Sequence, residues 1–215
     1  MGSRTADRQA GRSDCRPERL GVMGGTFDPP HYGHLVLAEN ARVQLQLDRV
    51  LFVPAGEPPH KPEEPITPAH HRTAMVEATV ADNAAFVLSR ADLDRPGPHY
   101  SVDMLGILRG LHHEATLFFL IGGDSLAEFL SWRNPAGIVE QAHLAVMRRP
   151  GWEADVASLE ARLPGIRERL TWLDAPHLEI SGTDLRRRVR DGLPIRYLVP
   201  HPVLGYVREH GLYRR

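Results

Sequence analysis

Short, uninterrupted hydrophobic runs constrain the fold of this chain more than any other feature. Five of them are separated by longer stretches of different pattern, and they are Leu20–Met23, Val50–Val53, Phe86–Leu88, Leu117–Ile121 and Leu144–Met147. Strands that are apolar at every position are typical of parallel sheets covered on both faces. The runs therefore predict buried parallel strands rather than a sheet with one face in water.

The stretches between these runs indicate helices. Hydrophobic residues recur at helical spacing in two of them, around Leu35–Leu45 and Met104–Leu111. The order strand, helix, strand predicts right-handed βαβ units, and hence an α/β fold built on a parallel sheet. In such sheets ligands bind beyond the carboxyl ends of the strands. The loops that meet there follow Met23, Val53, Ile121 and Met147.

Composition excludes several classes of protein. The chain has 215 residues, 42% of them hydrophobic, which is enough apolar material for a packed core. The single cysteine, Cys15, excludes a disulfide framework and a four-cysteine zinc site. No apolar run approaches the ~20 residues of a membrane span, and the first residues lack the apolar core of a signal peptide. The formal net charge of −1 argues against general nucleic-acid binding.

We therefore expect a cytoplasmic protein that acts without a membrane or nucleic-acid partner. Residues 1–18 are polar, rich in arginine and without periodicity, so we expect a disordered tail there and one domain over residues 19–215. The segment 55–68 is rich in proline and charge, and we expect it to be a functional loop. The sequence leaves the oligomeric state open, a homo-oligomer included.

The most informative segment is 24–34, which reads Gly-Gly-Thr-Phe-Asp-Pro-Pro-His-Tyr-Gly-His and follows the first predicted strand. Gly24 and Gly25 allow a ligand to approach the backbone closely. His31 and His34 lie one turn apart on the helix that we expect next, so both imidazoles share a face near the positive end of the helix dipole. Amide groups, glycines and imidazoles together predict a polyphosphate site.

The local signals place the start of that helix near Pro29. Asp28 suits an N-cap, and proline suits the first helical position. The segment is neither a dinucleotide fingerprint nor a P-loop, because Gly-x-Gly-x-x-Gly and Gly-Lys-Ser/Thr are both absent. A zinc site would need a third ligand, and no cysteine or glutamate stands at a useful spacing. An exposed histidine pair is the simpler alternative, but the glycines before it favour a ligand site.

This segment resembles the signature of the nucleotidyltransferase superfamily, which carries a His-x-x-His on its first helix. Further motifs follow in register and are similar to those of bacterial nicotinate-nucleotide adenylyltransferases, with the resemblance running from about Leu20 to Tyr213. They are Pro59-His60-Lys61, Gly97–Leu105, Ile121–Asp124, Ser131-Trp132, Arg149–Gly151, Ile180–Arg186, Tyr197–Pro200 and Gly211–Tyr213.

The resemblance implies a Rossmann-like, doubly wound parallel sheet with helices on both faces in a single domain. It also implies a reaction in which ATP and nicotinic acid mononucleotide give nicotinic acid adenine dinucleotide and pyrophosphate, a step of NAD synthesis. The mononucleotide phosphate attacks the α-phosphorus in line, without a covalent enzyme intermediate, and Mg²⁺ is bound mainly through the ATP phosphates. Such chemistry asks the protein for positioning and charge stabilisation, so an activated side-chain nucleophile is not needed.

The resemblance also implies which residues act. The catalytic groups are His31, His34 and Arg186. The ATP site comprises Gly24, Gly25, Thr26, Phe27, His31, His34, Asp124, Ile180, Ser181, Thr183 and Arg186. The mononucleotide site comprises Lys61, Arg72, Tyr100, Ser101, Trp132 and Arg133, with the Trp132 ring stacked on the pyridine. No protein metal ligand is assigned.

Each of these roles has a plainer structural alternative. Phe27 and Trp132 could be core residues, Lys61 a solvated lysine, and Asp124 a helix N-cap. Arg72 could pair with an acidic residue on its own helix. Two positions also depart from the family pattern, because Ser101 replaces a threonine and Gly182 replaces a serine, which removes one hydroxyl from the predicted adenylate site.

Other functions compete with this interpretation. The first is adenylyl or cytidylyl transfer to another phosphate acceptor such as phosphopantetheine, which would not explain Trp132 or the Pro-His-Lys loop. The second is a fragment of a class I aminoacyl-tRNA synthetase, but a Lys-Met-Ser-Lys-Ser loop is missing. The third is an ATP-binding sensor without turnover, which has less need of both His31 and His34.

Overall fold

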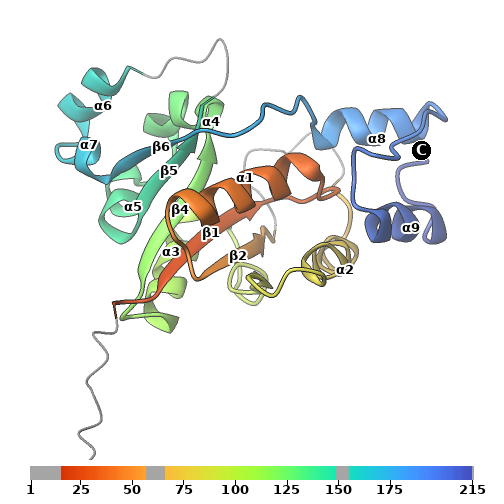
Figure 1. The fold of residues 1–215 in the computed structure, drawn as a ribbon, viewed down its shortest axis with the longest axis horizontal. Coiled ribbons are helices and arrows are strands. Elements are labelled where there is room, and N and C mark those ends of the chain that lie inside the picture. The colour runs from red at the N-terminus through yellow and green to blue at the C-terminus, as the bar shows by residue number, and fades with distance from the viewer. Residues whose placement is uncertain (1–15, 57–65, 149–154, 215) are drawn as a thin grey trace, which may run out of the picture.

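The computed structural model describes residues 16–56, 66–148 and 155–214 (Figure 1). The predicted tail 1–18 therefore lies largely outside the described residues. Its last residues contact the body of the protein, because Arg16 pairs with Asp48 at 2.7 Å and Glu18 pairs with Arg49 at 2.6 Å.

A six-stranded parallel sheet forms the centre of the molecule. The five predicted runs are all strands, and they are joined by a sixth that the sequence did not suggest. The strands are β1 (Arg19–Gly25), β2 (Arg49–Pro54), β3 (Phe86–Leu88), β4 (Thr116–Gly122), β5 (His143–Met147) and β6 (Leu170–Leu173). Their order, β3-β2-β1-β4-β5-β6, is that of a doubly wound Rossmann-like sheet, so the predicted fold is confirmed. The strand order reverses between β1 and β4, where such folds bind ligands.

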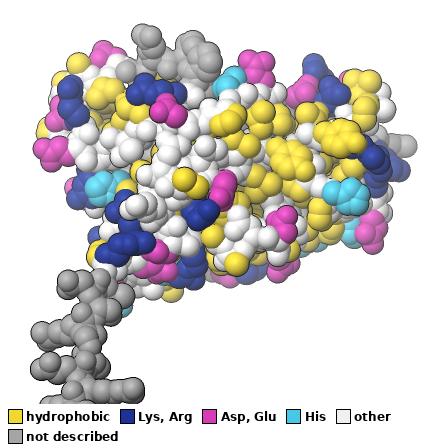
Figure 2. All heavy atoms as spheres, in the orientation of Figure 1, with side chains coloured by type: hydrophobic (Ala, Val, Ile, Leu, Met, Phe, Trp, Pro, Cys, Tyr) yellow, Lys and Arg dark blue, Asp and Glu magenta, His cyan; other side chains and the backbone are white. Residues whose placement is uncertain are grey.

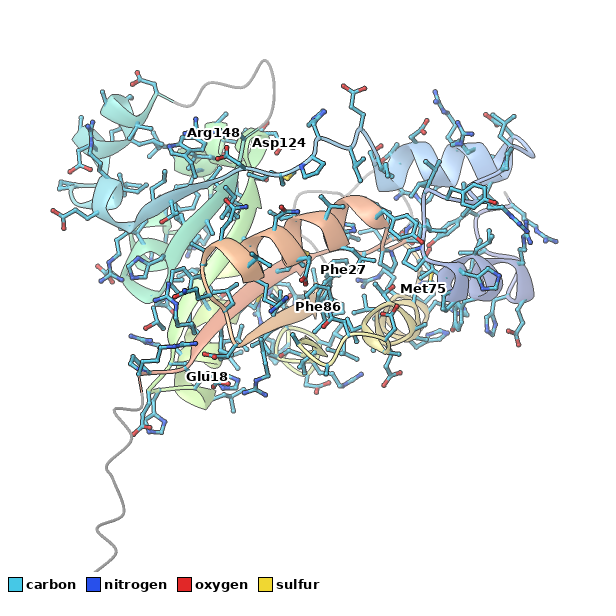
Figure 3. The ribbon with its side chains drawn as sticks, in the orientation of Figure 1. Glu18, Phe27, Met75, Phe86, Asp124 and Arg148 are labelled. Atoms are coloured by element: carbon cyan, nitrogen blue, oxygen red, sulfur yellow. The ribbon has the colours of Figure 1, made fainter. Side chains whose placement is uncertain are left out.

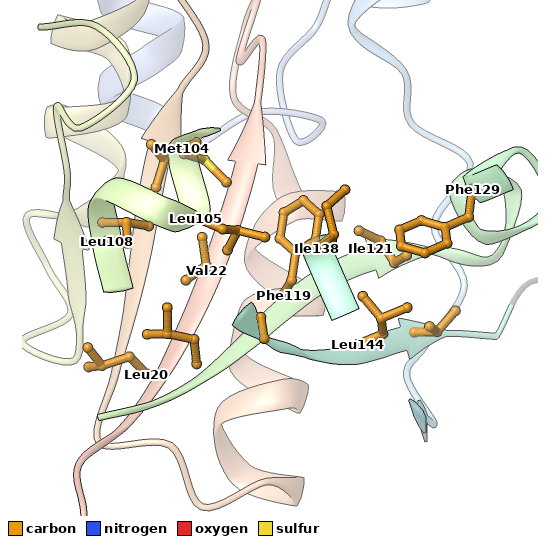
Figure 4. Close-up of a cluster of buried hydrophobic side chains, with 14 of the residues drawn as sticks. Leu20, Val22, Met104, Leu105, Leu108, Phe119, Ile121, Phe129, Ile138 and Leu144 are labelled. Carbon is orange, nitrogen blue, oxygen red and sulfur yellow. The ribbon is translucent and has the colours of Figure 1, made fainter. Parts of the chain in front are cut away.

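Helices cover both faces of the sheet. They are α1 (Tyr32–Gln44), α2 (Ala69–Val80), α3 (Ser101–Leu111), α4 (Gly123–Ala127), the 3₁₀ helix η1 (Phe129–Ser131), α5 (Pro135–Gln141), α6 (Val156–Arg162), α7 (Ile166–Arg169), α8 (Gly182–Arg190) and α9 (His201–Glu209). Side chains of a strand alternate between faces. Leu20 and Val22 therefore pack with Leu105 of α3 and Ile138 of α5 (Figure 4), whereas Met23 packs on the other face among residues of α1 and α2.

A third hydrophobic cluster joins the C-terminal helices to α2. It comprises Met75, Leu185, Ile195, Val199, Val203, Leu204 and Val207, all buried. In Figure 1, α8 and α9 lie at the right of the molecule, far from α6 and α7 at the left. The space-filling view shows hydrophobic and histidine side chains gathered on this right-hand part of the face (Figure 2). The C-terminal segment is thus packed beside α2, at the end where the loop after β1 emerges.

Over the described part of the chain, none of the helices combines the length and the apolar character that crossing a membrane would require.

Candidate active site

A cavity of about 590 Å³ opens at the carboxyl ends of the strands, where the sequence placed the ligand. Met23 of β1, Val53 of β2, Ile121 of β4 and Met147 of β5 all line it. Glycines make the space, because β1 ends in Gly24-Gly25 and β4 ends in Gly122. A cavity of this size is within the usual range for small-molecule sites.

Both histidines of the His-x-x-His motif line this cavity, but their helix begins later than predicted. Helix α1 starts at Tyr32, and His31, not Asp28, occupies the N-cap position. Asp28 is buried and its carboxylate accepts hydrogen bonds from remote segments instead. The prediction of an Asp28 cap with Pro29 in the first turn was therefore wrong, since tertiary contacts use the carboxylate that a cap would need.

The corrected helix start fixes the two imidazoles relative to each other. The His31 backbone N–H donates to Nδ1 of His34 at 3.1 Å, and the rings stack with centroids 3.8 Å apart. A neutral imidazole that accepts at Nδ1 carries its proton on Nε2, so His34 can donate from that atom. Gly33 makes room for this pair, because a Cβ at Gly33 would lie 3.0 Å from Nδ1 of His31.

The opposite side of the cavity is aromatic. Tyr100, Ser101, Trp132 and Arg133 all line it, as predicted for the mononucleotide side. Ser101 is the first residue of α3, and the Arg133 guanidinium carbon lies 5.8 Å from the Tyr100 ring centroid. Trp132 is partly buried against Phe119 and Phe129, with ring centroids at 6.2 and 5.6 Å. It thus packs on the core and lines the cavity at the same time.

Sequence reasoning missed a buried polar pair on this side. Asp92 and His99 line the cavity, with side chains 5% and 7% exposed and with Oδ2 and Nδ1 3.5 Å apart. Arg95 donates to Asp92 at 2.7–2.9 Å, which balances the carboxylate charge. The His99 ring covers Gly56 so closely that a Cβ there would lie 2.3 Å from the ring. Asp92 also accepts from the Gly56 N–H at 3.3 Å, across 36 positions of the chain, a tertiary contact that spacing in the sequence does not signal.

Arg72 does not reach the cavity, which corrects its predicted role in binding the mononucleotide. Its side chain is 1% exposed and donates to four backbone carbonyls, those of Thr26, Ala55, Gly56 and Thr67, at 2.7–2.9 Å. The alternative of an ion pair with Glu77 is not what this geometry shows either. Burial lowers the pKa of the guanidinium from its ordinary value, partly offset by the Asp28 carboxylate and Tyr213. Arg72 therefore holds the loops after β1 and β2 together.

The N-terminus of α8 flanks the cavity from the C-terminal segment. Ile180 lines the cavity, and Ser181 is the N-cap of α8, with its hydroxyl accepting from the Asp184 N–H at 3.2 Å. Arg186 donates from Nη1 to the Asp28 carbonyl at 2.9 Å and from Nη2 to the Thr183 hydroxyl at 3.3 Å. Helix α8 brings these groups next to the loop after β1.

The remaining predicted residues divide between the cavity and the core. Gly24, Gly25, Thr26 and Asp124 line the cavity. Asp124 lies in the first turn of α4, after the N-cap Gly122, so the alternative of an Asp124 cap is wrong. Phe27 is 2% exposed and packs beneath α1 with its ring 4.9 Å from that of His34 (Figure 3).

Lys61 lies outside the described residues, so the structure does not place this predicted mononucleotide contact.

Comparison with known proteins agrees with this arrangement. A family model described as cytidylyltransferase-like matches residues 22–188. The chain is 49% identical over 196 residues to a probable nicotinate-nucleotide adenylyltransferase of Thermomicrobium roseum, covering 91% of this chain and 92% of that protein. It is 43% identical over 199 residues to a protein of the same name from Saccharopolyspora erythraea, covering 93% and 91%.

Among solved structures, the nicotinic acid mononucleotide adenylyltransferase of Plasmodium falciparum in complex with NaAD is similar, with a TM-score of 0.74. The similarity covers 92% of this chain and 98% of that one at 19% sequence identity, a level at which the likeness concerns the fold.

Proposed function

The chain belongs to the cytidylyltransferase-like family and, within it, to the nicotinate-nucleotide adenylyltransferases, and on that premise we propose that it converts ATP and nicotinic acid mononucleotide into nicotinic acid adenine dinucleotide and pyrophosphate. One observation carries the proposal. A single cavity has a polar side of glycine backbone and paired imidazoles and an aromatic side around Trp132, which suits a triphosphate next to a pyridine nucleotide.

The reaction is one displacement at the α-phosphorus of ATP. An oxygen of the mononucleotide phosphate forms the new P–O bond, and the bond from the α-phosphorus to the bridging oxygen of the β-phosphate breaks. That oxygen leaves as part of pyrophosphate. Negative charge moves onto the leaving group, so the protein accelerates the step mainly by holding the two substrates in line and by stabilising this charge.

His34 is the group we assign to that stabilisation. Its Nδ1 accepts from the His31 N–H, and Nε2 is the atom that we assign to donate to a phosphate oxygen. The backbone of Gly24–Thr26 approaches the same side of the cavity without Cβ atoms at the two glycines. Arg186 and the N-terminus of α8 add positive potential beside the loop after β1, where α-phosphate and pyrophosphate oxygens would lie.

The aromatic side binds the mononucleotide in this proposal. Trp132 stacks on the pyridine ring, and its own packing on Phe119 and Phe129 keeps it oriented before the substrate arrives. The Arg133 guanidinium and backbone N–H groups nearby meet the nicotinate carboxylate. Tyr100 and Ser101 stand beside them at the start of α3.

We further propose that Mg²⁺ enters with ATP, held by phosphate and water oxygens, the hard ligands that this ion prefers. In the part of the chain that the structure describes, His, Cys, Asp and Glu side chains do not gather in threes as a protein-built metal site would need. Asp124, in the first turn of α4, is the carboxylate that would help to hold the ion through water. When bound, the ion neutralises charge on the phosphates.

The test is pyrophosphate release from ATP with one acceptor at a time. We expect turnover with nicotinic acid mononucleotide, much slower turnover with nicotinamide mononucleotide, and none with phosphopantetheine. Chelation of divalent ions should abolish the reaction. Release with phosphopantetheine alone would reassign the acceptor, and ATP binding without release for any acceptor would make the protein a sensor.

A further inference from the structure

Asp28 connects three segments that are far apart in the sequence. Its Oδ1 accepts from the Tyr213 hydroxyl at 2.7 Å, and its Oδ2 accepts from the Thr67 N–H at 3.1 Å. Its backbone carbonyl accepts from Nη1 of Arg186 at 2.9 Å. The residue is 4% exposed. One buried residue thus ties the loop after β1 to the segment before α2, to α8 and to the end of the chain.

The loop that Asp28 belongs to carries the phosphate side of the cavity. Thr26 and His31, both of which line the cavity, lie two and three residues from Asp28. The loop and α8 are in close contact here, because a Cβ on Gly182 would lie 2.9 Å from the Asp28 carbonyl oxygen. This close approach is the physical reason why glycine suits position 182. Any shift of Asp28 therefore changes the distance between the histidines and Arg186.

Tyr213 is held firmly enough to act as the fixed end of this connection. It packs against the third hydrophobic cluster, and its backbone has a φ of 64°, a left-handed conformation that a bulky residue adopts only where its surroundings impose it. Burial, and then the Asp28 carboxylate, raise the pKa of the phenol far above its ordinary value. The hydroxyl consequently stays protonated and donates to Asp28 at every pH at which the protein is studied.

We propose that Tyr213 is a positioning residue for adenylyl transfer, which acts through Asp28 to fix the loop of Thr26 and His31 relative to Arg186. Tyr213 does not line the cavity and is not a catalytic residue. The inference rests on the proposed function for its kinetic part. It explains why a residue two positions from the C-terminus, separated from Asp28 by 185 residues, carries a buried hydroxyl aimed at the loop after β1.

The chain offers a matched control in Tyr206. Its hydroxyl hydrogen-bonds Nδ1 of His71 at 3.0 Å, and the residue also packs on the third cluster. Tyr213→Phe and Tyr206→Phe therefore remove the same atom from the same part of the molecule. They differ in that only the first hydroxyl reaches Asp28.

We would measure kcat, both KM values, the melting temperature and the calorimetric Kd for ATP in the two variants. For Tyr213→Phe we expect kcat to fall about 10-fold and the ATP Kd to rise several-fold, since displacements of about 1 Å can cost as much as 100-fold in rate. The KM for the mononucleotide should stay within twofold. Tyr206→Phe should keep kcat, both KM values and the ATP Kd within twofold of the wild type, whatever its melting temperature.

A double-variant cycle tests the route. If Tyr213 acts through Asp28, adding Tyr213→Phe to Asp28→Ala should slow the enzyme no further. The inference is overturned if Tyr213→Phe keeps both kcat and the ATP Kd, if Tyr206→Phe matches its losses, or if both KM values rise together. A wild type that binds ATP but releases no pyrophosphate would refute the proposed function, and the ATP Kd values of the two variants would still decide the inference.

Discussion

The two ends of the same parallel sheet are built in opposite ways. At the amino ends, charged residues at the starts of strands are paired. Arg49 at the start of β2 meets Glu18 at 2.6 Å, and the Arg19 guanidinium lies 4.5 Å from the centroid of the Phe118 ring, which stacks on His143. At the carboxyl ends, β1 and β4 finish in glycines and a cavity of about 590 Å³ opens.

This difference shows which features of the sheet make room for a ligand and which do not. At the amino ends, the charged side chains named above are already engaged with other residues of the protein, so they do not present themselves to a ligand. At the carboxyl ends, glycines withdraw side chains from the space between β1 and β4, and helix N-termini supply amide groups. The comparison predicts that changes at the carboxyl ends alter catalysis or the loops that support it, and that changes at the amino ends alter stability alone.

Replacement of Arg72 should have the largest effect and tests what supports the carboxyl end. In Arg72→Met, four buried carbonyls lose their donor at ~1 kcal/mol or more each, so we expect the free energy of unfolding to fall by about 4 kcal/mol. For a domain of this size the melting temperature should drop by roughly 10 °C. Arg90→Met is the control, since Arg90 is exposed and pairs with the exposed Asp94, and it should melt like the wild type. A shift under about 2 °C for Arg72→Met would show that the loops hold without it.

Replacement of His34 should come next and separates catalysis from folding. Removing one preorganised donor at a transition state costs about 100- to 1,000-fold in kcat, or roughly 3 kcal/mol, and we expect this for His34→Ala. The melting temperature should change by only a few degrees, because the contacts that the variant loses are local: the N–H bond from His31 and the ring contacts with His31 and Phe27. His143→Ala, at the amino end, should keep its kcat. Near-normal turnover in His34→Ala would contradict the assigned role.

The fold was readable from the sequence wherever strands are fully buried. The five apolar runs became β1 to β5 because both faces of each strand are covered. The sixth strand, Leu170–Leu173, was missed because Thr171 interrupts it at an exposed position, so it lacks the apolar run that made the other edge strand, β3, readable. Its existence depends on pairing with β5, which only the tertiary structure provides.

Site residues could be predicted from the sequence where neighbouring residues form the site. They could not be predicted where the site depends on contacts between segments that are far apart in the chain. The glycines and histidines of segment 24–34 act through one turn of chain, so their spacing was informative. Arg72 and Asp28 instead bond to groups 5 to 185 residues away. A buried arginine and an exposed one look alike in sequence, which is why Arg72 was assigned to the substrate rather than to the loops.

Within the carboxyl end, Trp132→Ala should affect one substrate only. Stacking of a base-like ring on an aromatic side chain contributes about 1–3 kcal/mol, so the KM for the mononucleotide should rise about 10-fold or more while the KM for ATP stays within twofold. Trp172→Ala is the matched control, because Trp172 lies on β6 outside the cavity and packs under Arg148 at 4.8 Å. Equal rises in both KM values would remove the stacking role and make Trp132 a general support of the cavity.

The smallest expected effect belongs to the amino end and concerns pH. Burial lowers the pKa of His143 below its ordinary value of 6.5, and the positive charges of Arg169 and Arg19 lower it further. Between the lowered pKa and 6.5 the folded chain binds fewer protons at this site than the unfolded chain, so His143 should make stability fall as the pH drops below about 6.5.

His143→Phe keeps a ring against Phe118 but cannot titrate. Its melting temperature should therefore decline less steeply than that of the wild type between pH 7 and 5, whereas exposed His113→Phe should follow the wild type. Identical slopes in all three proteins would mean that His143 is not the titrating group, and any change of kcat at pH 8 in His143→Phe would break the division between the two ends of the sheet.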